Sequence, residues 1–263
     1  MQTSTSDQIR AAVRQAYGAI GTRERHSGCC GSGSSCCGPT GSSSKQLGYT
    51  DADLAGVPEG ADLSLGCGNP QAIAGLRPGE RVLDLGSGAG FDAFLAAQQV
   101  GPTGHVIGVD MTPEMIDRAK ANAAKTGLAH VDFRLGEIEH LPVEDASVDV
   151  IMSNCVINLA PDKPTVFREA FRVLAPGGRL AVSDVVAIGD IPAAIAADPA
   201  AYTGCVAGAA PIPELQWMIA DAGFEDIRIA VQVRSRTLIE EWRPGSGAEQ
   251  FVASALIEAV KPA

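Results

Sequence analysis

Three single cysteines, Cys67, Cys155 and Cys205, are the residues whose type and placement point most directly to chemistry. Each lies in a loop-forming context, and they accompany one glycine-rich segment, residues 86–90. Thiolates are the preferred ligands of soft, thiophilic atoms, whereas oxygen and nitrogen donors suit hard substrates such as phosphates. The sequence therefore predicts a nucleotide-type cofactor site with a sulfur-lined site for a soft substrate beside it.

Four further cysteines form two vicinal pairs, Cys29-Cys30 and Cys36-Cys37, in a segment rich in glycine and serine. This composition cannot bury a core, so we expect a flexible segment unless its thiols hold it in place. An incidental cysteine-bearing tail is the alternative. A structural zinc site is disfavoured, because the chain has no C-x-x-C and its four histidines lack metal-ligand spacing.

The glycine-rich segment follows an apolar run that ends near Asp84, and a helical pattern follows it. Glycines let the chain turn sharply and let a cofactor approach the backbone closely. The dinucleotide fingerprint G-x-G-x-x-G requires glycine where this chain has Phe91, so a nicotinamide-binding enzyme is disfavoured. Asp110, at the end of the next apolar run, is placed to accept two hydrogen bonds from a ribose diol.

An aspartate followed by G-x-G-x-G resembles motif I of the class I S-adenosylmethionine-dependent methyltransferases. The resemblance implies S-adenosylmethionine as the cofactor, with adenine contacts from Glu137 and Ile138. The complete set of contacts that we expect is Asp84, Gly86, Ser87, Gly88, Asp110, Met111, Glu137, Ile138 and Asn154.

The cysteine segments make the resemblance more specific. Residues 65–70 (LGCGNP), 153–159 (SNCVINL) and 204–209 (GCVAGA) are similar to segments of the arsenite S-adenosylmethionine methyltransferases, and the similarity covers about residues 60–215. It implies that Cys155 and Cys205 hold As(III), with Cys67 as a third thiol or a redox partner. It also implies arsenite, its thiol conjugates and methylated arsenicals as substrates, and glutathione or thioredoxin as the external reductant. Which of the accessory thiols Cys29, Cys30, Cys36 and Cys37 takes part stays open.

The elements that must position these groups alternate between strand and helix from about residue 80. This alternation predicts a doubly wound, mostly parallel α/β sheet of the Rossmann-like class I methyltransferase type. Strands are expected at residues 81–85, 105–110, 131–135, 148–153, 179–186 and 226–233. Helices are expected at residues 7–17, 92–100, 112–126 with Thr112 as the cap, 164–174 and 213–222, and a tight turn at residues 176–178. Residues 251–260 fit either a strand or a helix.

The chain of 263 residues has a net charge of -11, and 46% of its residues are hydrophobic. Its acidity and lack of basic runs argue against nucleic acid as a partner. We also expect no membrane contact and a cytoplasmic location, since the first residues lack a secretory pattern and no apolar run reaches membrane-span length.

We expect three segments: an N-terminal helix with the cysteine-rich segment (1–60), the cofactor-binding core (61–186), and an arsenic-binding insertion with the rest of the fold over the site (187–263). Two alternatives stay open. A methyltransferase for an organic small molecule leaves the cysteines unexplained. A metalloid-binding protein without turnover leaves the cofactor loop unexplained.

Overall fold

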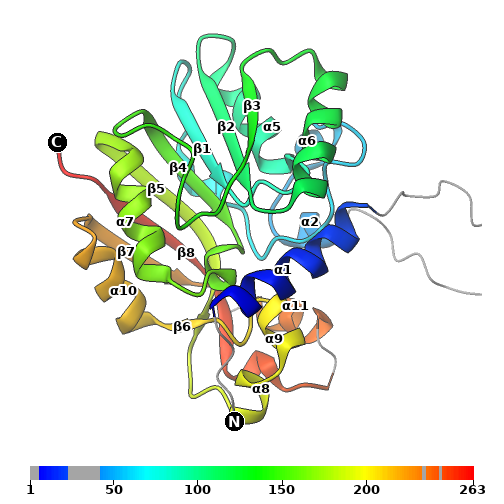
Figure 1. Cartoon of the computed structure of the whole chain (residues 1–263), viewed down its shortest axis with the longest axis vertical. Helices are drawn as coiled ribbons and strands as arrows, with labels where there is room; N and C mark the ends of the chain where they lie inside the picture. Colours follow the sequence, from blue (N-terminus) through cyan, green and yellow to red (C-terminus); the bar gives the residue numbers. More distant parts are fainter. Residues whose placement is uncertain (1–5, 23–41, 233–234, 243–244) are drawn as a thin grey trace, which may run out of the picture.

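An eight-stranded sheet forms the centre of the protein in the computed structural model, which describes residues 6–22, 42–232, 235–242 and 245–263 (Figure 1). The expectations for Cys29, Cys30, Cys36 and Cys37 lie outside these residues. The strands follow the order β3-β2-β1-β4-β5-β8-β7, and β6 pairs with β5. Their bounds are β1 (Arg81–Leu85), β2 (His105–Asp110), β3 (Val131–Leu135), β4 (Val148–Asn154), β5 (Leu174–Ala187), β6 (Ala210–Pro211), β7 (Glu225–Val231) and β8 (Val252–Val260).

The register of the parallel strands explains their continuous apolar sequence. Val82 of β1 pairs with Val106 of β2 and Val150 of β4, and all three side chains are buried in one cluster. The next residue of β1, Leu83, pairs with Ile107, and both belong to the cluster on the opposite face. Because both faces are covered, consecutive residues in the middle of these strands are apolar, rather than every second one.

Helices cover both faces of the sheet (Figure 1). Helices α5 (Phe91–Val100) and α6 (Pro113–Thr126) pack on one face, and α7 (Lys163–Val173) and α10 (Ile212–Asp221) on the other. The remaining helices are α1 (Ser6–Gly21), α2 (Ser42–Gln46), α3 (Asp51–Gly56), α4 (Gln71–Ala74), α8 (Ala193–Ala196), α9 (Pro199–Thr203), α11 (Ser235–Trp242), and the 3-10 helices η1 (Ile157–Leu159) and η2 (Ala248–Gln250).

The expected doubly wound α/β fold is confirmed, and Thr112 is the N-cap residue of α6 as expected. The Thr112 side chain makes no capping hydrogen bond within the described chain; its backbone N–H instead donates to the Asp110 carboxylate at 2.8 Å. The expected turn at residues 176–178 lies within β5, where Gly177 has a φ of +76° and the register against β4 shifts. Residues 252–260 form a strand, because β8 pairs with both β5 and β7.

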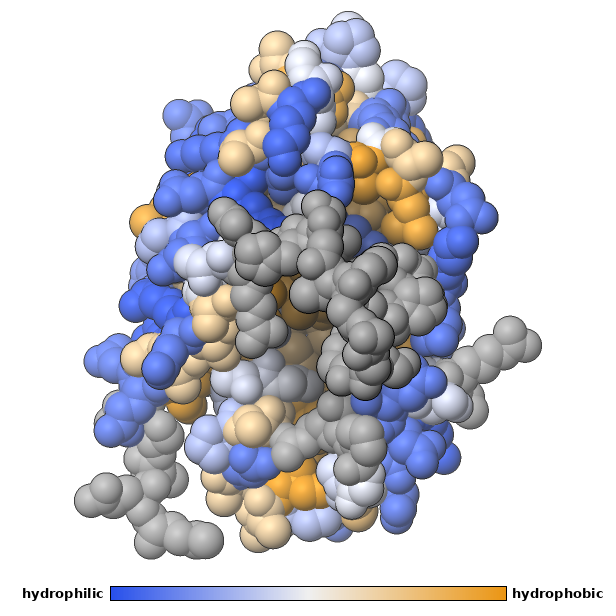
Figure 2. All heavy atoms as spheres, turned by 90° about the vertical axis from the view of Figure 1, so that its right-hand side faces the viewer, coloured by the Kyte–Doolittle hydropathy of each residue, from blue (hydrophilic) through white to orange (hydrophobic). Residues whose placement is uncertain are grey.

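Hydrophilic residues predominate around the outline of the face shown in Figure 2, and apolar residues gather there in small groups. Among the described residues, four large apolar side chains are exposed, namely Leu65, Leu135, Ile188 and Trp217. No helix in the described ranges combines the length and the apolarity that a membrane span requires.

Candidate active site

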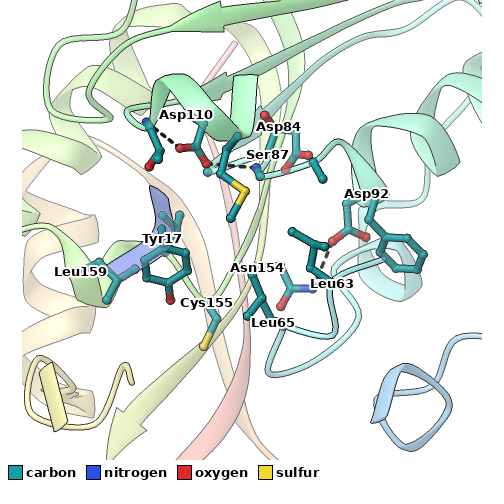
Figure 3. Close-up of a pocket in the computed structure, with 18 of the residues that line it drawn as sticks. Tyr17, Leu63, Leu65, Asp84, Ser87, Asp92, Asp110, Asn154, Cys155 and Leu159 are labelled. Carbon is teal, nitrogen blue, oxygen red and sulfur yellow. Dashed lines mark hydrogen bonds between the residues drawn. The ribbon is translucent and has the colours of Figure 1, made fainter. Parts of the chain in front are cut away.

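A cavity lies at the carboxyl ends of β1, β2 and β4 (Figure 3). Ligands of doubly wound sheets bind at this edge. All the expected cofactor contacts except Glu137 line the cavity: Asp84, Gly86, Ser87, Gly88, Asp110, Met111, Ile138 and Asn154. The fold thus brings together positions that are up to 70 residues apart in the sequence.

The glycine-rich loop between β1 and α5 has a backbone that favours glycine. Gly86 and Gly88 have φ angles of +67° and +51°. A Cβ on Gly86 would come within 2.4 Å of Val156, whereas a Cβ on Gly88 would meet no described atom within 4 Å. Gly86 therefore permits tight packing of the loop, and Gly88 leaves the backbone open to a ligand.

Buried acidic side chains give the cavity a negative character. One carboxylate oxygen of Asp84 and the hydroxyl of Ser87 are buried without a hydrogen-bond partner among the described residues. Burial raises the pKa of Asp84 well above its usual value, and the charges of Asp92 and Asp110 raise it further. Asp110 accepts hydrogen bonds from the N–H groups of Gly88 (3.0 Å) and Thr112 (2.8 Å). A cationic ligand with hydroxyl groups would meet the unpaired oxygens of Asp84 and Ser87 in this cavity.

Asn154 joins the cavity wall to the loop that carries Cys67. Its Oδ1 accepts a hydrogen bond from the Cys67 backbone N–H at 3.0 Å, and its Nδ2 lies 3.1 Å from a carboxylate oxygen of Asp92. The Tyr49 hydroxyl donates to the other Asp92 oxygen at 2.7 Å. The expected site residues did not include Tyr49 and Asp92. Asp92 directly follows the glycine-rich loop and Phe91, Tyr49 belongs to no motif, and only the fold brings both to Asn154.

The three expected arsenic ligands converge, and all three are buried. Cys155, directly after β4, and Cys205, after α9, both have a φ of +60°, a strained conformation for residues other than glycine. The Sγ atoms of Cys67 and Cys155 and a carboxylate oxygen of Asp184 all lie within 4.8 Å of one another. The Cys205 thiol donates to the backbone oxygen of Cys155 at 3.0 Å. Two of the five described non-glycine residues with positive φ are therefore cysteines of this site.

Burial favours the protonated thiol form of Cys67 and Cys155. It raises the pKa of Cys67 to about 11. It also raises the pKa of Cys155 well above the usual value, and contacts with the other two thiols add to this effect. A ligand that binds as a thiolate complex must therefore remove the thiol protons.

A second hollow reaches the thiols from outside the cofactor cavity. It is lined by Cys155, Cys205 and parts of α1 and α9, and it shares a wall with the cofactor cavity. The shared wall consists of Tyr17, Ser64, Leu65, Gly66 and Cys155. Figure 3 shows Tyr17, Leu65 and Cys155 at the lower side of the cofactor cavity. Cys155 is therefore accessible from both spaces.

Helix α1 closes the cofactor cavity on one side. Arg10, Val13 and Tyr17 line the cavity, and Arg10 donates to Glu139 at 3.0 Å. Glu137 does not line the cavity; its carboxylate pairs with Arg10 at 3.4 Å and with Arg14. Glu137 thus holds α1 in place in this structure, which sequence reasoning missed because α1 lies more than 100 residues away.

A family model described as a methyltransferase domain matches residues 76–223, which is more than half of the chain. The match covers β1 to α10 and includes the glycine-rich loop and Cys155. The chain therefore belongs to the methyltransferase-domain family.

Within that family, the chain belongs with the arsenite methyltransferases. A crystal structure of an arsenic(III) S-adenosylmethionine methyltransferase from Chlamydomonas reinhardtii shares 34% identity and a TM-score of 0.66, covering 81% of this chain and 75% of that one. An arsenite methyltransferase of Halobacterium salinarum is 53% identical over 92% of this chain and 66% of its own length. One from Aquipseudomonas alcaligenes is 44% identical over 65% of this chain and 51% of its own length. The chain thus spans about half to two thirds of these curated relatives.

Proposed function

We propose that this protein transfers a methyl group from S-adenosylmethionine to trivalent arsenic bound by Cys67, Cys155 and Cys205. The observation that carries the proposal is the shared wall at Cys155. One side of this wall is a cavity with an unpaired carboxylate oxygen of Asp84, and the other is a hollow lined by Cys155 and Cys205. A methyl donor in the cavity and a soft methyl acceptor bound by the thiols would therefore meet at Cys155.

The cofactor side of the cavity fits a cationic nucleoside. The unpaired oxygen of Asp84 and the nearby charge of Asp92 would attract the positively charged amino acid part. Asp110 retains acceptor capacity for ribose hydroxyls, and Met111 and Ile138 offer apolar contacts for a base. When bound there, S-adenosylmethionine supplies an electrophilic methyl group.

The thiols can bind arsenite without a net release of protons. Each thiol forms an S–As bond, one As–OH bond breaks, and the thiol proton leaves with the hydroxide as water. Protonated, buried thiols such as Cys67 are therefore suitable ligands for neutral arsenite despite their raised pKa. Three S–As bonds leave the arsenic with its lone pair.

Methyl transfer from this state requires mainly position and the exclusion of water. The attacking lone pair carries no proton, so a general base is not needed. Transfer formally oxidises arsenic by two electrons. Two protein thiols can return these electrons and form a disulfide, which glutathione or thioredoxin then reduces.

The direct test is incubation of the purified protein with arsenite, S-adenosylmethionine and a thiol reductant, with separation and elemental detection of the arsenic species. We expect methylated arsenicals only when all components are present. Cofactor binding and arsenite binding without a methylated product would contradict the proposal and favour a binding protein without turnover. Cofactor binding without arsenite binding would favour an organic substrate.

A further inference from the structure

Asp184 on β5 is a buried carboxylate that the proposed arsenic chemistry does not use. One of its oxygens lies within 4.8 Å of the Sγ atoms of both Cys67 and Cys155. Trivalent arsenic is satisfied by three thiolates, and a carboxylate is a hard donor that it does not prefer. The presence of an oxygen donor beside two of the three thiols therefore points to a second kind of ligand.

The surrounding backbone holds this carboxylate in a fixed orientation. The N–H of Val185 donates to one oxygen at 2.8 Å, and the N–H of Asn158 donates to the other at 3.2 Å. Each oxygen keeps further acceptor capacity, because a carboxylate offers about four lone-pair sites. Lys163 faces the group from α7, but its Nζ donates to the backbone oxygens of Asn158 and Ala160.

We propose that Cys67, Cys155 and Asp184 form a binding site for a thiophilic divalent cation such as Zn²⁺, with Cys205 as the fourth ligand. Cysteine sulfur and aspartate oxygen are both ligands of Zn²⁺, which favours a tetrahedral set, with Zn–S distances of about 2.3 Å and Zn–O distances of about 2.0–2.2 Å. These distances place neighbouring ligand atoms roughly 3.5–4 Å apart. The Sγ atoms of Cys67 and Cys155 and the Asp184 oxygen, all within 4.8 Å of one another, need only a small contraction to reach this geometry. Cys205 lies outside this set, and its thiol, now 3.0 Å from the Cys155 backbone oxygen, would have to turn toward it.

The donors come from three separate segments, which explains why ligand spacing in the sequence does not reveal them. Cys67 precedes β1, Cys155 follows β4, and Asp184 lies within β5. The backbone oxygen of Ser183 links them, since it accepts hydrogen bonds from the Cys155 N–H at 2.8 Å and the Cys67 thiol at 3.6 Å. Parallel pairing of β4 with β5 therefore assembles the cluster.

Occupancy by the cation would exclude arsenic, because both ligands need the same thiols. This consequence rests on the proposed function, whereas cation binding itself does not. The two ligands differ in their proton balance. Zn²⁺ replaces the thiol protons, which pass to the solvent, whereas arsenite removes them as water. Cation binding should therefore strengthen as the pH rises, and binding of neutral arsenite should change much less.

The test uses the full chain with Cys29, Cys30, Cys36 and Cys37 replaced by Ser, so that only the three buried thiols can give a thiolate signal. Reduced protein is titrated with Co²⁺, whose visible spectrum reports tetrahedral thiolate coordination, and then with Zn²⁺ in competition. We expect one cation per chain, and displacement of Co²⁺ by one equivalent of arsenite. Asp184→Asn should weaken Co²⁺ binding at least about tenfold while arsenite affinity stays within about threefold. The matched control Asp132→Asn, at the surface on β3, should change neither.

The absence of cobalt–thiolate absorption in this background would overturn the proposal. A bound cation that arsenite does not displace would contradict the shared use of the thiols, which rests on the proposed function, and not cation binding itself. Unchanged Co²⁺ affinity in Asp184→Asn would remove the carboxylate from the site. If Asp184→Asn does not fold, Cys67→Ser serves instead and should lose most of the absorption. Cation binding without arsenic methylation would contradict only the proposed function, and methylation without cation binding would contradict only this inference.

Discussion

Cys155 is the residue on which both binding spaces depend. It lines the cofactor cavity and the thiol hollow, and its backbone is held in the left-handed region by the hydrogen bond from its N–H to Ser183. We expect Cys155→Ser to reduce arsenic methylation at least about 100-fold, because the arsenic would no longer be held beside the methyl donor. Serine preserves the size and the backbone, so cofactor affinity, measured by calorimetry, should change less than about threefold. Methylation at the wild-type rate would exclude Cys155 as an arsenic ligand.

Asp84 supplies an unpaired carboxylate oxygen to the cofactor cavity, and a bound cation would favour its ionised form against its raised pKa. Asp84→Asn keeps the shape of the side chain but removes its charge, and we expect the affinity for S-adenosylmethionine to fall about 10- to 100-fold. Equilibrium binding by calorimetry measures this change, with arsenite affinity as the internal control. Equal cofactor affinity in the variant and the wild type would mean that the positively charged part of S-adenosylmethionine binds away from Asp84.

At the scale of elements, α1 separates the two binding spaces from each other through Tyr17. This side chain belongs to the shared wall, and its hydroxyl donates only a long hydrogen bond of 3.3 Å to the Thr203 backbone oxygen. We expect Tyr17→Ala to lower methylation at least about tenfold, since water could then enter between donor and acceptor. Tyr17→Phe keeps the ring and should retain at least half of the activity. A larger loss in Tyr17→Phe than in Tyr17→Ala would assign the role to the hydroxyl.

The same elements show what the sequence could predict. Strands β1, β2 and β3 coincide with the expected ranges. In β1 and β2, a run of mostly apolar residues marks the strand, because both faces of these strands are covered. The glycine loop and Asp110 were predictable for a similar reason, since the loop directly follows β1 and Asp110 is the last residue of β2. The position of α1, the contact between Tyr49 and Asp92 and the meeting of Asp184 with the thiols were not predictable. Each joins segments that are far apart in the chain, and only tertiary packing decides such contacts.

At the scale of the whole molecule, the buried acidic groups link stability to pH. Burial raises the pKa of Asp184 to about 6, against an unfolded value near 4. The folded protein therefore binds this proton more tightly than the unfolded chain, and its contribution to stability is full below about pH 4 and is lost as the pH rises through about 6. This shift corresponds to about 3 kcal/mol, an upper limit for one group.

Asp184→Asn cannot titrate at this position, so comparison with the wild type isolates the effect. The free energy of unfolding of the wild type, relative to that of Asp184→Asn, should fall by up to about 3 kcal/mol between pH 4 and pH 7, because only the wild type must then bury a charge. Urea denaturation of reduced protein without arsenite or metal ions measures this difference. The surface variant Asp132→Asn should show a change of less than about 0.5 kcal/mol over the same range. A flat difference for Asp184→Asn would show that the carboxylate is already stabilised as an anion in the folded protein, and a rising difference would require a cationic partner within the cluster.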